Sequence, residues 1–313
     1  MSRPLLSIVV PLYRSADSIE RLIRELSALP VEGGCELVLV NDGSPDNTAE
    51  LAEKFMQSSP RAITLVKLSR NFGEYNAVMA GLHHATGDYI VTMDDDLQNP
   101  PSEVLKLLAH AQAGKHDVVY SFYAEKQHDR WRNFGSWMTN RVADLLLDKP
   151  RGLYLSSFRV MSHFVAKQIC RFDGPFVYVD GMILQVTQNI GRLEVLHAER
   201  ATGTSGYTFR RLVRLWLAMF VGFSVMPLRL ATALGFLLAV SGFLSGIAVV
   251  VIRLLYGSVE GWTSLMVALL LFSGTQLILL GVAGEYIGRT YLTANRRPQF
   301  VVRDVVRNAA VPR

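Results

Sequence analysis

Residues 89–101 read YIVTMDDDLQNPP, in which a short apolar run, Tyr89–Met93, is followed at once by three acidic residues. The run has the length and the β-branched composition of a strand that is buried on both faces. Pro101 is typical of the first position of a helix, and we expect that helix to run to about Ala113. The stretch therefore predicts a strand, an acidic turn and a helix in succession.

The same alternation of short apolar runs with amphipathic segments extends outward from this stretch, from Leu6 to about Ser121. We expect the other strands at 6–10, 36–40, 63–66 and 118–120, and a helix at 18–29. This alternation predicts a Rossmann-like α/β fold with a mostly parallel sheet, which binds its ligands at the carboxyl ends of the strands. The run Gly-x-Gly-x-x-Gly does not follow the first strand, which argues against a dinucleotide-binding domain.

Asp94, Asp95 and Asp96 lie where the strand at 89–93 is expected to end. Carboxylates this close repel one another unless a cation neutralises them, and Mg²⁺ or Mn²⁺ that also bridges diphosphate oxygens would do so. If strand geometry continues, Asp94, Asp96 and Gln98 share one face and Asp95 lies opposite. We therefore expect Asp94, Asp96 and Gln98 to bind a metal, the alternative being a solvated loop or a helix-capping cluster.

A second polar turn, Asn41–Asp46, follows the expected strand at 36–40. Its residue types also form ordinary turns, so the motif alone does not identify a site. Together with Tyr13, which follows the first strand, it puts an aromatic ring and the carboxylate of Asp42 at adjacent strand ends. This pair is suited to stacking on a nucleotide base and binding its polar edge.

The C-terminal third of the chain indicates a membrane protein. Of 313 residues 50% are hydrophobic, too many for an average soluble enzyme. Uncharged spans are expected at about 230–252 and 264–284, each close to the ~20 residues that cross a bilayer. Arginines flank the pair on its outer sides, whereas the loop at 256–262 has no Lys or Arg, so both termini should be cytoplasmic.

The net charge of +5 does not indicate nucleic acid, because the arginines gather around this apolar third and favour an anionic membrane surface as partner. Amphipathic segments at about 131–147 and at 209–228 are expected to form helices in the membrane interface. We expect a cytoplasmic domain at 1–208, a juxtamembrane helix at 209–228, a membrane region at 229–289 and a cytoplasmic tail at 290–313.

Six short blocks add a family resemblance: Ser69–Gly73, Ala80–Leu82, Ala85–Asp88, Asp96–Pro101, His197–Arg200 and Gly284–Tyr291. In this order they resemble the family 2 glycosyltransferases with the GT-A fold, and more narrowly the polyprenyl-phosphate glycosyltransferases related to dolichol-phosphate mannose synthase. The resemblance covers nearly the whole chain. It includes the two C-terminal membrane helices of the bacterial members, which lie in the inner membrane.

The resemblance implies three groups of site residues. The nucleotide-sugar donor would be bound by Pro11, Tyr13, Asp42, Arg70, Asp94 and Asp95. The lipid phosphate would be bound by Arg132, Ser136, Arg200 and Ser205. Asp94, Asp96 and Arg200 would be the catalytic residues. An arginine fork suits a phosphate dianion, although each arginine taken singly could be an ordinary surface charge.

The implied reaction is one inverting, metal-dependent displacement that moves a sugar from a UDP-linked donor to undecaprenyl phosphate. The product would serve cell-envelope glycans or the modification of lipid A or O-antigen. A lipid phosphate is already anionic near neutral pH, so no catalytic base is expected. A rival family 2 transferase with another acceptor would add a Gln-x-x-Arg-Trp-type motif, which the chain lacks. A non-catalytic nucleotide-binding scaffold would place polar or ionisable groups inside the spans. The spans contain no ionisable residue, and the polar side chains well inside them are only Ser241, Ser245, Ser273, Thr275 and Gln276.

Two residues depart from the family pattern. Gly206 stands where a Lys is usual, and Tyr123 stands where an Arg is common; Lys126 or Arg130 could compensate. Asp180 is expected either to orient sugar hydroxyls or to be a simple loop acid. The resemblance also implies a homo-oligomer, such as a tetramer.

Overall fold

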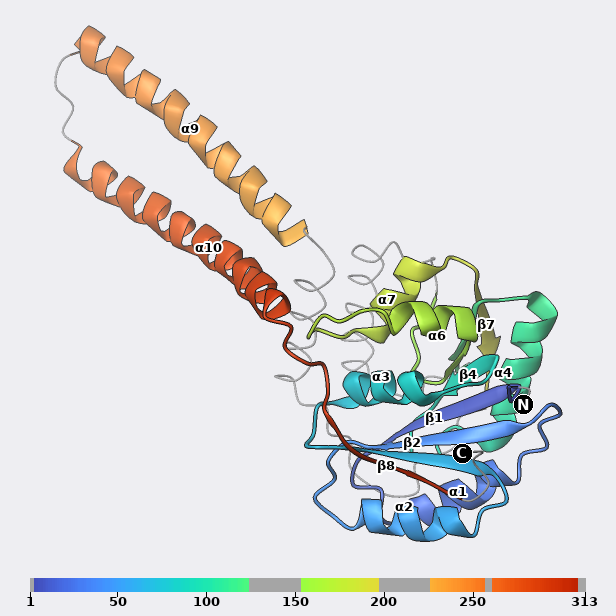
Figure 1. Ribbon diagram of the computed structural model, residues 1–313. Coiled ribbons are helices and arrows are strands. Elements are labelled where there is room, and N and C mark those ends of the chain that lie inside the picture. Colours follow the sequence, from blue (N-terminus) through green and yellow to red (C-terminus); the bar gives the residue numbers. More distant parts are fainter. Residues whose placement is uncertain (1–2, 124–152, 197–225, 257–260, 309–313) are drawn as a thin grey trace. The chain divides into compact units, whose positions relative to one another are not determined.

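Figure 1 shows the computed structural model of the chain, which describes residues 3–123, 153–196, 226–256 and 261–308. Contacts divide the chain into two units, one made of Met1–Tyr207 with Arg296–Arg313 and the other of Thr208–Asn295. The predicted amphipathic helix at 131–147 and residues 209–225 of the predicted juxtamembrane helix lie outside the described residues.

The described strands of the first unit form one eight-stranded sheet of order β7-β5-β6-β4-β1-β2-β3-β8. The strands are β1 (Leu6–Leu12), β2 (Cys35–Asn41), β3 (Ala62–Leu68), β4 (Tyr89–Thr92), β5 (Val118–Phe122), β6 (Arg159–Ser162), β7 (Ile190–Glu194) and β8 (Val302–Arg307). Neighbours from β4 to β3 are parallel, as are β5 and β7, whereas β6 and β8 run antiparallel to their neighbours. The prediction of a mostly parallel α/β sheet is confirmed.

Helices cover both faces of this sheet. The structure contains α1 (Ile19–Ser27), α2 (Thr48–Gln57), α3 (Glu74–His84), α4 (Pro101–Gly114), α6 (His163–Ile169) and α7 (Val179–Val186). Figure 1 shows α1 and α2 on one side of β1 and β2 and α3 on the other. The carboxyl ends of the parallel strands, where the sequence predicts the ligands, are therefore supported by helices on both faces of the sheet.

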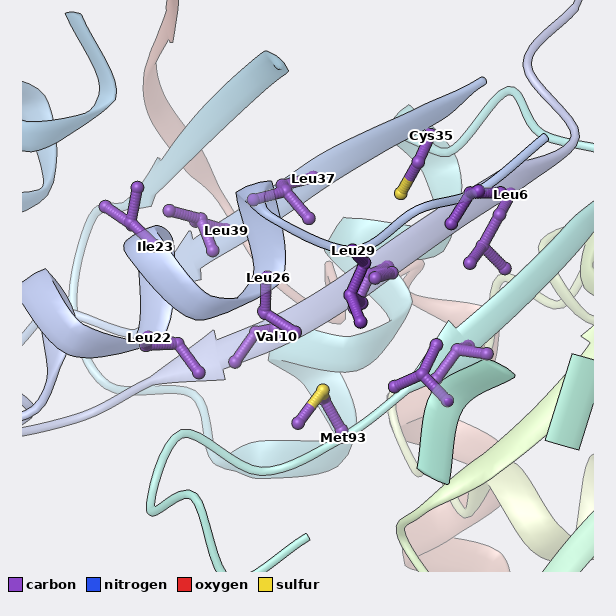
Figure 2. Close-up of a cluster of buried hydrophobic side chains, with 14 of the residues drawn as sticks. Leu6, Val10, Leu22, Ile23, Leu26, Leu29, Cys35, Leu37, Leu39 and Met93 are labelled. Carbon is purple, nitrogen blue, oxygen red and sulfur yellow. The ribbon is translucent and has the colours of Figure 1, made fainter. Parts of the chain in front are cut away.

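The main hydrophobic core lies between the sheet and the helices α1, α2 and α4. Figure 2 shows Leu22 and Leu26 of α1 close to Val10 of β1, with Met93 beside them, and all four side chains are buried. Each fully buried side chain of this size contributes roughly 1.5–3 kcal/mol. This core fixes β1 and the residues after β4 against each other.

Helix α3 lies directly on the opposite face of the sheet. Gly81 makes this approach possible, because a Cβ atom there would overlap the side chain of Val9 and lie 3.1 Å from Cγ2 of Val40. The close packing holds the first residue of α3, Glu74, near the carboxyl ends of the strands.

The C-terminal segment returns to the eight-stranded sheet as its edge strand. β8 pairs antiparallel with β3, and Asp304 lies opposite Lys67, with a Nζ to Oδ2 distance of 3.4 Å. Beyond the strand, the side chain of Asn308 accepts the amide N–H of Ile63 at 3.0 Å and donates to the carbonyl of Arg61 at 2.8 Å. The tail predicted at 290–313 did not include this strand.

The second unit contains two long apolar helices, α9 (Met226–Tyr256) and α10 (Trp262–Ala294). Their candidate membrane spans, Ala231–Ile252 and Leu271–Ala294, have mean hydropathies of 2.4 and 1.2. The prediction of two spans is confirmed, although the second lies further along the chain than 264–284. Pro227 stands in the first turn of α9, where its missing N–H leaves no helical hydrogen bond unmade.

Cysteines placed at Lys67 and Asp304 should form a disulfide, because the two residues are direct partners in β3 and β8. The native thiols should not compete, since burial raises the pKa of both Cys35 and Cys170 to about 12. The measurement is the shift in gel mobility of the oxidised full-length protein. The control pairs Lys67→Cys with Arg307→Cys, three residues out of register and roughly 10 Å further along the strand. Equal cross-linking of both pairs would contradict the observed register.

Candidate functional site

The carboxyl ends of β1, β2, β3 and β4 meet at one edge of the sheet, because these strands are parallel. Leu12 of β1 lies opposite Asn41 of β2, and Val9 lies opposite Thr92, the last residue of β4. β4 thus ends earlier than β1, and the residues that follow β4 lie beside the last three residues of β1. The loops that follow all four strands start at this edge.

The acidic turn is built differently from the prediction. β4 ends at Thr92, and Leu97 has a φ of +56°, so strand alternation does not apply to residues 94–98. The carboxylates are instead separated by the turn. Asp94 accepts a hydrogen bond from the hydroxyl of Ser157 at 2.7 Å, whereas Asp95 accepts one from the hydroxyl of Ser15.

Asp95 is also tied to the end of β1, because its Oδ2 accepts the amide N–H of Tyr13 at 3.3 Å. Asp96 accepts the amide N–H of Gln98 at 3.1 Å, which closes the turn. The turn therefore divides its acids between two surroundings, with Asp94 next to the β6 side and Asp95 next to β1.

Negative charge is crowded at Asp94. Burial raises the pKa of its carboxyl to about 7, the charges of Glu74, Asp96 and Asp95 act in the same direction, and the Ser157 hydrogen bond opposes them. Carboxylate oxygens at a crowded site are the ligands that Mg²⁺ and Mn²⁺ prefer, so the donor set fits a divalent cation. Within the described ranges, no three His, Cys, Asp or Glu side chains are grouped as a metal cluster. The predicted set of Asp94, Asp96 and Gln98, two carboxylates and one amide, therefore stays a prediction.

The loop after β3, Ser69–Gly73, is held against the turn after β2. Both oxygens of buried Asp42 accept amide N–H groups of this loop, Oδ1 from Phe72 at 2.7 Å and Oδ2 from Gly73 at 2.9 Å. Burial raises the pKa of Asp42, and these two hydrogen bonds lower it. Asp42 thus has a loop-holding role that the sequence did not indicate, and its contact with a nucleotide stays a prediction.

Gly43 allows the same loop to come close. It has a φ of +58°, and a Cβ atom there would overlap the carbonyl carbon of Arg70 and lie 2.6 Å from the amide nitrogen of Asn71. Arg70 itself is exposed, and its guanidinium carbon lies 4.3 Å from the ring centroid of Phe72. The loop thus presents one arginine, stacked on an aromatic ring, at the sheet edge.

An exposed tyrosine completes this edge. Tyr13 is 44% exposed and directly follows Leu12, the last residue of β1, while Pro11 within the strand is half-buried. The guanidinium of Arg14 lies 5.6 Å from the Tyr13 ring centroid. The backbone N–H of Arg14 donates to the Ser44 hydroxyl at 3.2 Å. Arg14 was not among the predicted site residues, since a single Arg after a strand carries no sequence signal.

Asp180 is not the loop acid that was one of the two expectations for it, and its contact with sugar hydroxyls stays a prediction. It lies in α7, almost fully buried, where it forms an ion pair with Arg159 and accepts the hydroxyl of Tyr120 at 2.9 Å. Arg159 also donates to the carbonyl of Ser156 at 3.4 Å, next to the serine that binds Asp94. Removing one partner of a buried ion pair lowers the stability of a protein by about 3–5 kcal/mol. This pair therefore helps to hold the segment that contains Ser157, the partner of Asp94.

The remaining predicted residues divide by position. Tyr123 is described, and its hydroxyl donates to Oδ1 of Asn99 at 2.7 Å. The predicted phosphate-binding residues and the residues that could compensate for Tyr123 lie outside the described part of the chain: Lys126, Arg130, Arg132, Ser136, Arg200 and Ser205. Gly206, where a Lys is usual in the family, also lies outside it.

The fold and the site define the class of protein as a GT-A-type α/β enzyme with an acidic turn after β4. The chain belongs to glycosyl transferase family 2, whose family model matches residues 7–170. It is 34% identical over 306 residues to undecaprenyl-phosphate 4-deoxy-4-formamido-L-arabinose transferase of Klebsiella pneumoniae, with 96% of this chain and 93% of the relative covered. The enzyme of the same name from Pseudomonas aeruginosa is 35% identical, with 97% and 91% covered.

Solved structures share the fold. Glucosyl-3-phosphoglycerate synthase from Mycobacterium tuberculosis, in complex with Mn²⁺, UDP-glucose and phosphoglyceric acid, matches with a TM-score of 0.53 and 21% identity over 71% of this chain and 79% of that chain. Its complex with phosphoglyceric acid matches with a TM-score of 0.51, over 70% and 80%. The family resemblance is confirmed, and the chain is a glycosyltransferase.

Gly43→Ala should weaken nucleotide binding by at least about tenfold, because the new methyl group would push the Ser69–Gly73 loop away from β2. The control is Gly34→Ala at the opposite end of β2, whose φ is also positive, at +92°, but whose Cβ atom would only reach ordinary contact with Pro4 at 3.8 Å. Binding of UDP to the two full-length variants is measured by calorimetry. Equal losses of affinity would show that backbone strain, not the close approach to Arg70, decides the effect.

Proposed function

We propose that this protein transfers a sugar from a nucleotide-sugar donor to undecaprenyl phosphate at the cytoplasmic leaflet of the inner membrane. The observation that carries the proposal is the likeness, over more than nine-tenths of the chain, to transferases named for undecaprenyl phosphate. Two apolar helices of sufficient length to cross a bilayer are in keeping with a lipid acceptor.

The donor is UDP-linked in this proposal. Support comes from the M. tuberculosis synthase, which shares the fold and was solved with UDP-glucose. The exposed ring of Tyr13 and the guanidinium of Arg70 are suited to a base and a diphosphate, and they stand on loops that start at the same sheet edge. Asp95 contributes by holding the backbone of Tyr13.

Asp94 and Asp96, with Gln98, hold a divalent cation in this proposal, Mg²⁺ or Mn²⁺. A bound cation supplies charge stabilisation to the leaving diphosphate. The residues of the chain do the positioning. Ser157 orients the carboxylate of Asp94, while Asp42 and Gly43 keep the Arg70 loop against β2.

The chemical step is a single displacement with inversion. An oxygen of the lipid phosphate forms a bond to the anomeric carbon as the bond from that carbon to the nucleoside diphosphate breaks. The acceptor oxygen is already anionic, so no side chain has to remove a proton. Arg200 is proposed to stabilise the leaving group and, with Arg132, Ser136 and Ser205, to bind the lipid phosphate. The enzyme is proposed to act as a homo-oligomer, such as a tetramer.

The proposed topology places both ends of the chain in the cytoplasm. β8 follows α10 and pairs with β3 of the sheet that precedes α9, so the chain must return to the side from which it left. Two crossings meet this requirement, and the arginines outside the helix pair favour the cytoplasmic side.

Asp96→Ala should lower sugar transfer to undecaprenyl phosphate by more than about 100-fold, because the diphosphate loses its stabilisation. The matched control is Asp88→Ala, which removes an exposed carboxylate from the opposite end of β4. Release of nucleoside diphosphate is followed with a panel of nucleotide sugars, with EDTA and with Mg²⁺ or Mn²⁺ restored. Wild-type turnover by Asp96→Ala, or full activity in EDTA, would rule out the proposed metal site.

A cysteine at Gly261, at the start of α10, should react with a membrane-impermeant maleimide added to intact spheroplasts. A cysteine at exposed Arg307 in β8 should react only after the membrane is opened. Mass spectrometry of the labelled protein distinguishes the two sites. Labelling of Arg307→Cys in intact spheroplasts would overturn the proposed topology.

A further inference from the structure

The contact between the C-terminal segment and the catalytic sheet extends beyond the β8 ladder to Ser69. The amide N–H of Ser69 donates to the carbonyl of Val301 at 2.9 Å. The carbonyl of Ser69 accepts a hydrogen bond from the guanidinium of Arg303 at 3.4 Å. Both backbone groups of the residue before Arg70 are therefore bound by residues that follow the membrane helices.

The other side of this loop is held from β2. Asp42 binds the amides of Phe72 and Gly73, so Arg70 lies between two attachments, one at Ser69 and one at Phe72. Residues 69–73 contain no helix or strand. The conformation of the loop depends on these attachments, because it has no regular backbone hydrogen bonding of its own.

The C-terminal segment is itself firmly attached. Asn308 is 4% exposed, and its side chain and backbone make hydrogen bonds to Ile63, Met56 and Arg61. At the other end, the ring of Phe300 packs edge-on to His83 with centroids 5.8 Å apart. The side-chain amide of Gln299 donates to the carbonyl of Phe172. A segment fixed at both ends can hold a loop in place.

We infer that the C-terminal segment is a positioning element of the donor site, in which Val301 and Arg303 hold Ser69 so that Arg70 meets the donor diphosphate. This inference rests on the proposed function, since it takes Arg70 to bind the donor. Only residues 295–300 separate the end of α10 from Val301. The chain that leaves the membrane therefore contributes directly to the donor site, beyond anchoring the enzyme.

Arg303→Ala is compared with Arg307→Ala in the full-length, detergent-solubilised protein. Both variants remove an arginine from β8, but Arg307 pairs with Thr64, roughly 13 Å further along the strand from the loop. In Arg303→Ala we expect hydrogen exchange of the peptide covering residues 69–73 to become faster and the affinity for UDP to fall about 3- to 10-fold. The donor KM should rise by a similar factor, with the acceptor KM and kcat within about twofold of wild type. Arg307→Ala should match wild type in all of these.

Asn308→Ala provides a second variant, which loosens the far end of the segment without touching the loop. We expect its Tm to fall by about 2–6 °C and the same peptide to exchange faster, with a smaller loss of UDP affinity.

The inference is overturned if Arg303→Ala equals Arg307→Ala in exchange and UDP affinity, or if the loop exchanges faster while UDP affinity stays unchanged. Failure of wild-type protein to transfer sugar from any donor, with the exchange and UDP results as expected, would overturn only the proposed function.

Discussion

Parallel hydrogen bonding of β1 with β2 and β4 is the constraint on which the rest of the site depends. The register puts Leu12 level with Asn41 and Val9 level with Thr92, so β4 ends earlier than β1. The acidic turn consequently starts beside the end of β1, close enough for Asp95 to bind the amide of Tyr13. A slip of one residue would turn the buried side chains of a strand to the wrong face, so the register and the core require each other.

Packing on both faces keeps this edge in place. Apolar side chains of α1, α2 and α4 fill one face, while α3 reaches the other face through Gly81. Beneath the acidic turn the support is polar, because Arg159 and Asp180 form a buried ion pair that also involves Tyr120. Removing either partner of such a pair would leave an uncompensated buried charge. The carboxyl ends of the strands are thus held in place by the apolar core with α1, α2 and α4 and by the polar network of Arg159, Asp180 and Tyr120.

Much of this architecture was predictable from local patterns. Short β-branched runs identified β1 to β5, Pro101 identified the start of α4, and uncharged apolar stretches identified both membrane helices. β8 was not predicted, because its sequence, VRDVVR, is short and half polar, as suits an exposed edge strand. Its partner β3 also lies more than 230 residues earlier in the chain. The strand alternation assumed for residues 94–98 failed because Leu97 takes a left-handed conformation that ends the extended chain.

By itself the sequence determined the α/β class, the acidic turn after β4 and the two apolar helices, since each depends on residues that are near one another in the chain. It also determined the family, through short blocks that can each be read locally and that follow one another in a fixed order. Only the tertiary structure decided which partners those residues take. Asp42 holds the loop after β3, Asp180 pairs with Arg159, Ser157 binds Asp94, and the last strand binds Ser69. Hydrogen bonds and ion pairs between distant segments leave no periodic trace in a sequence, because they are set by how the strands are ordered in the sheet.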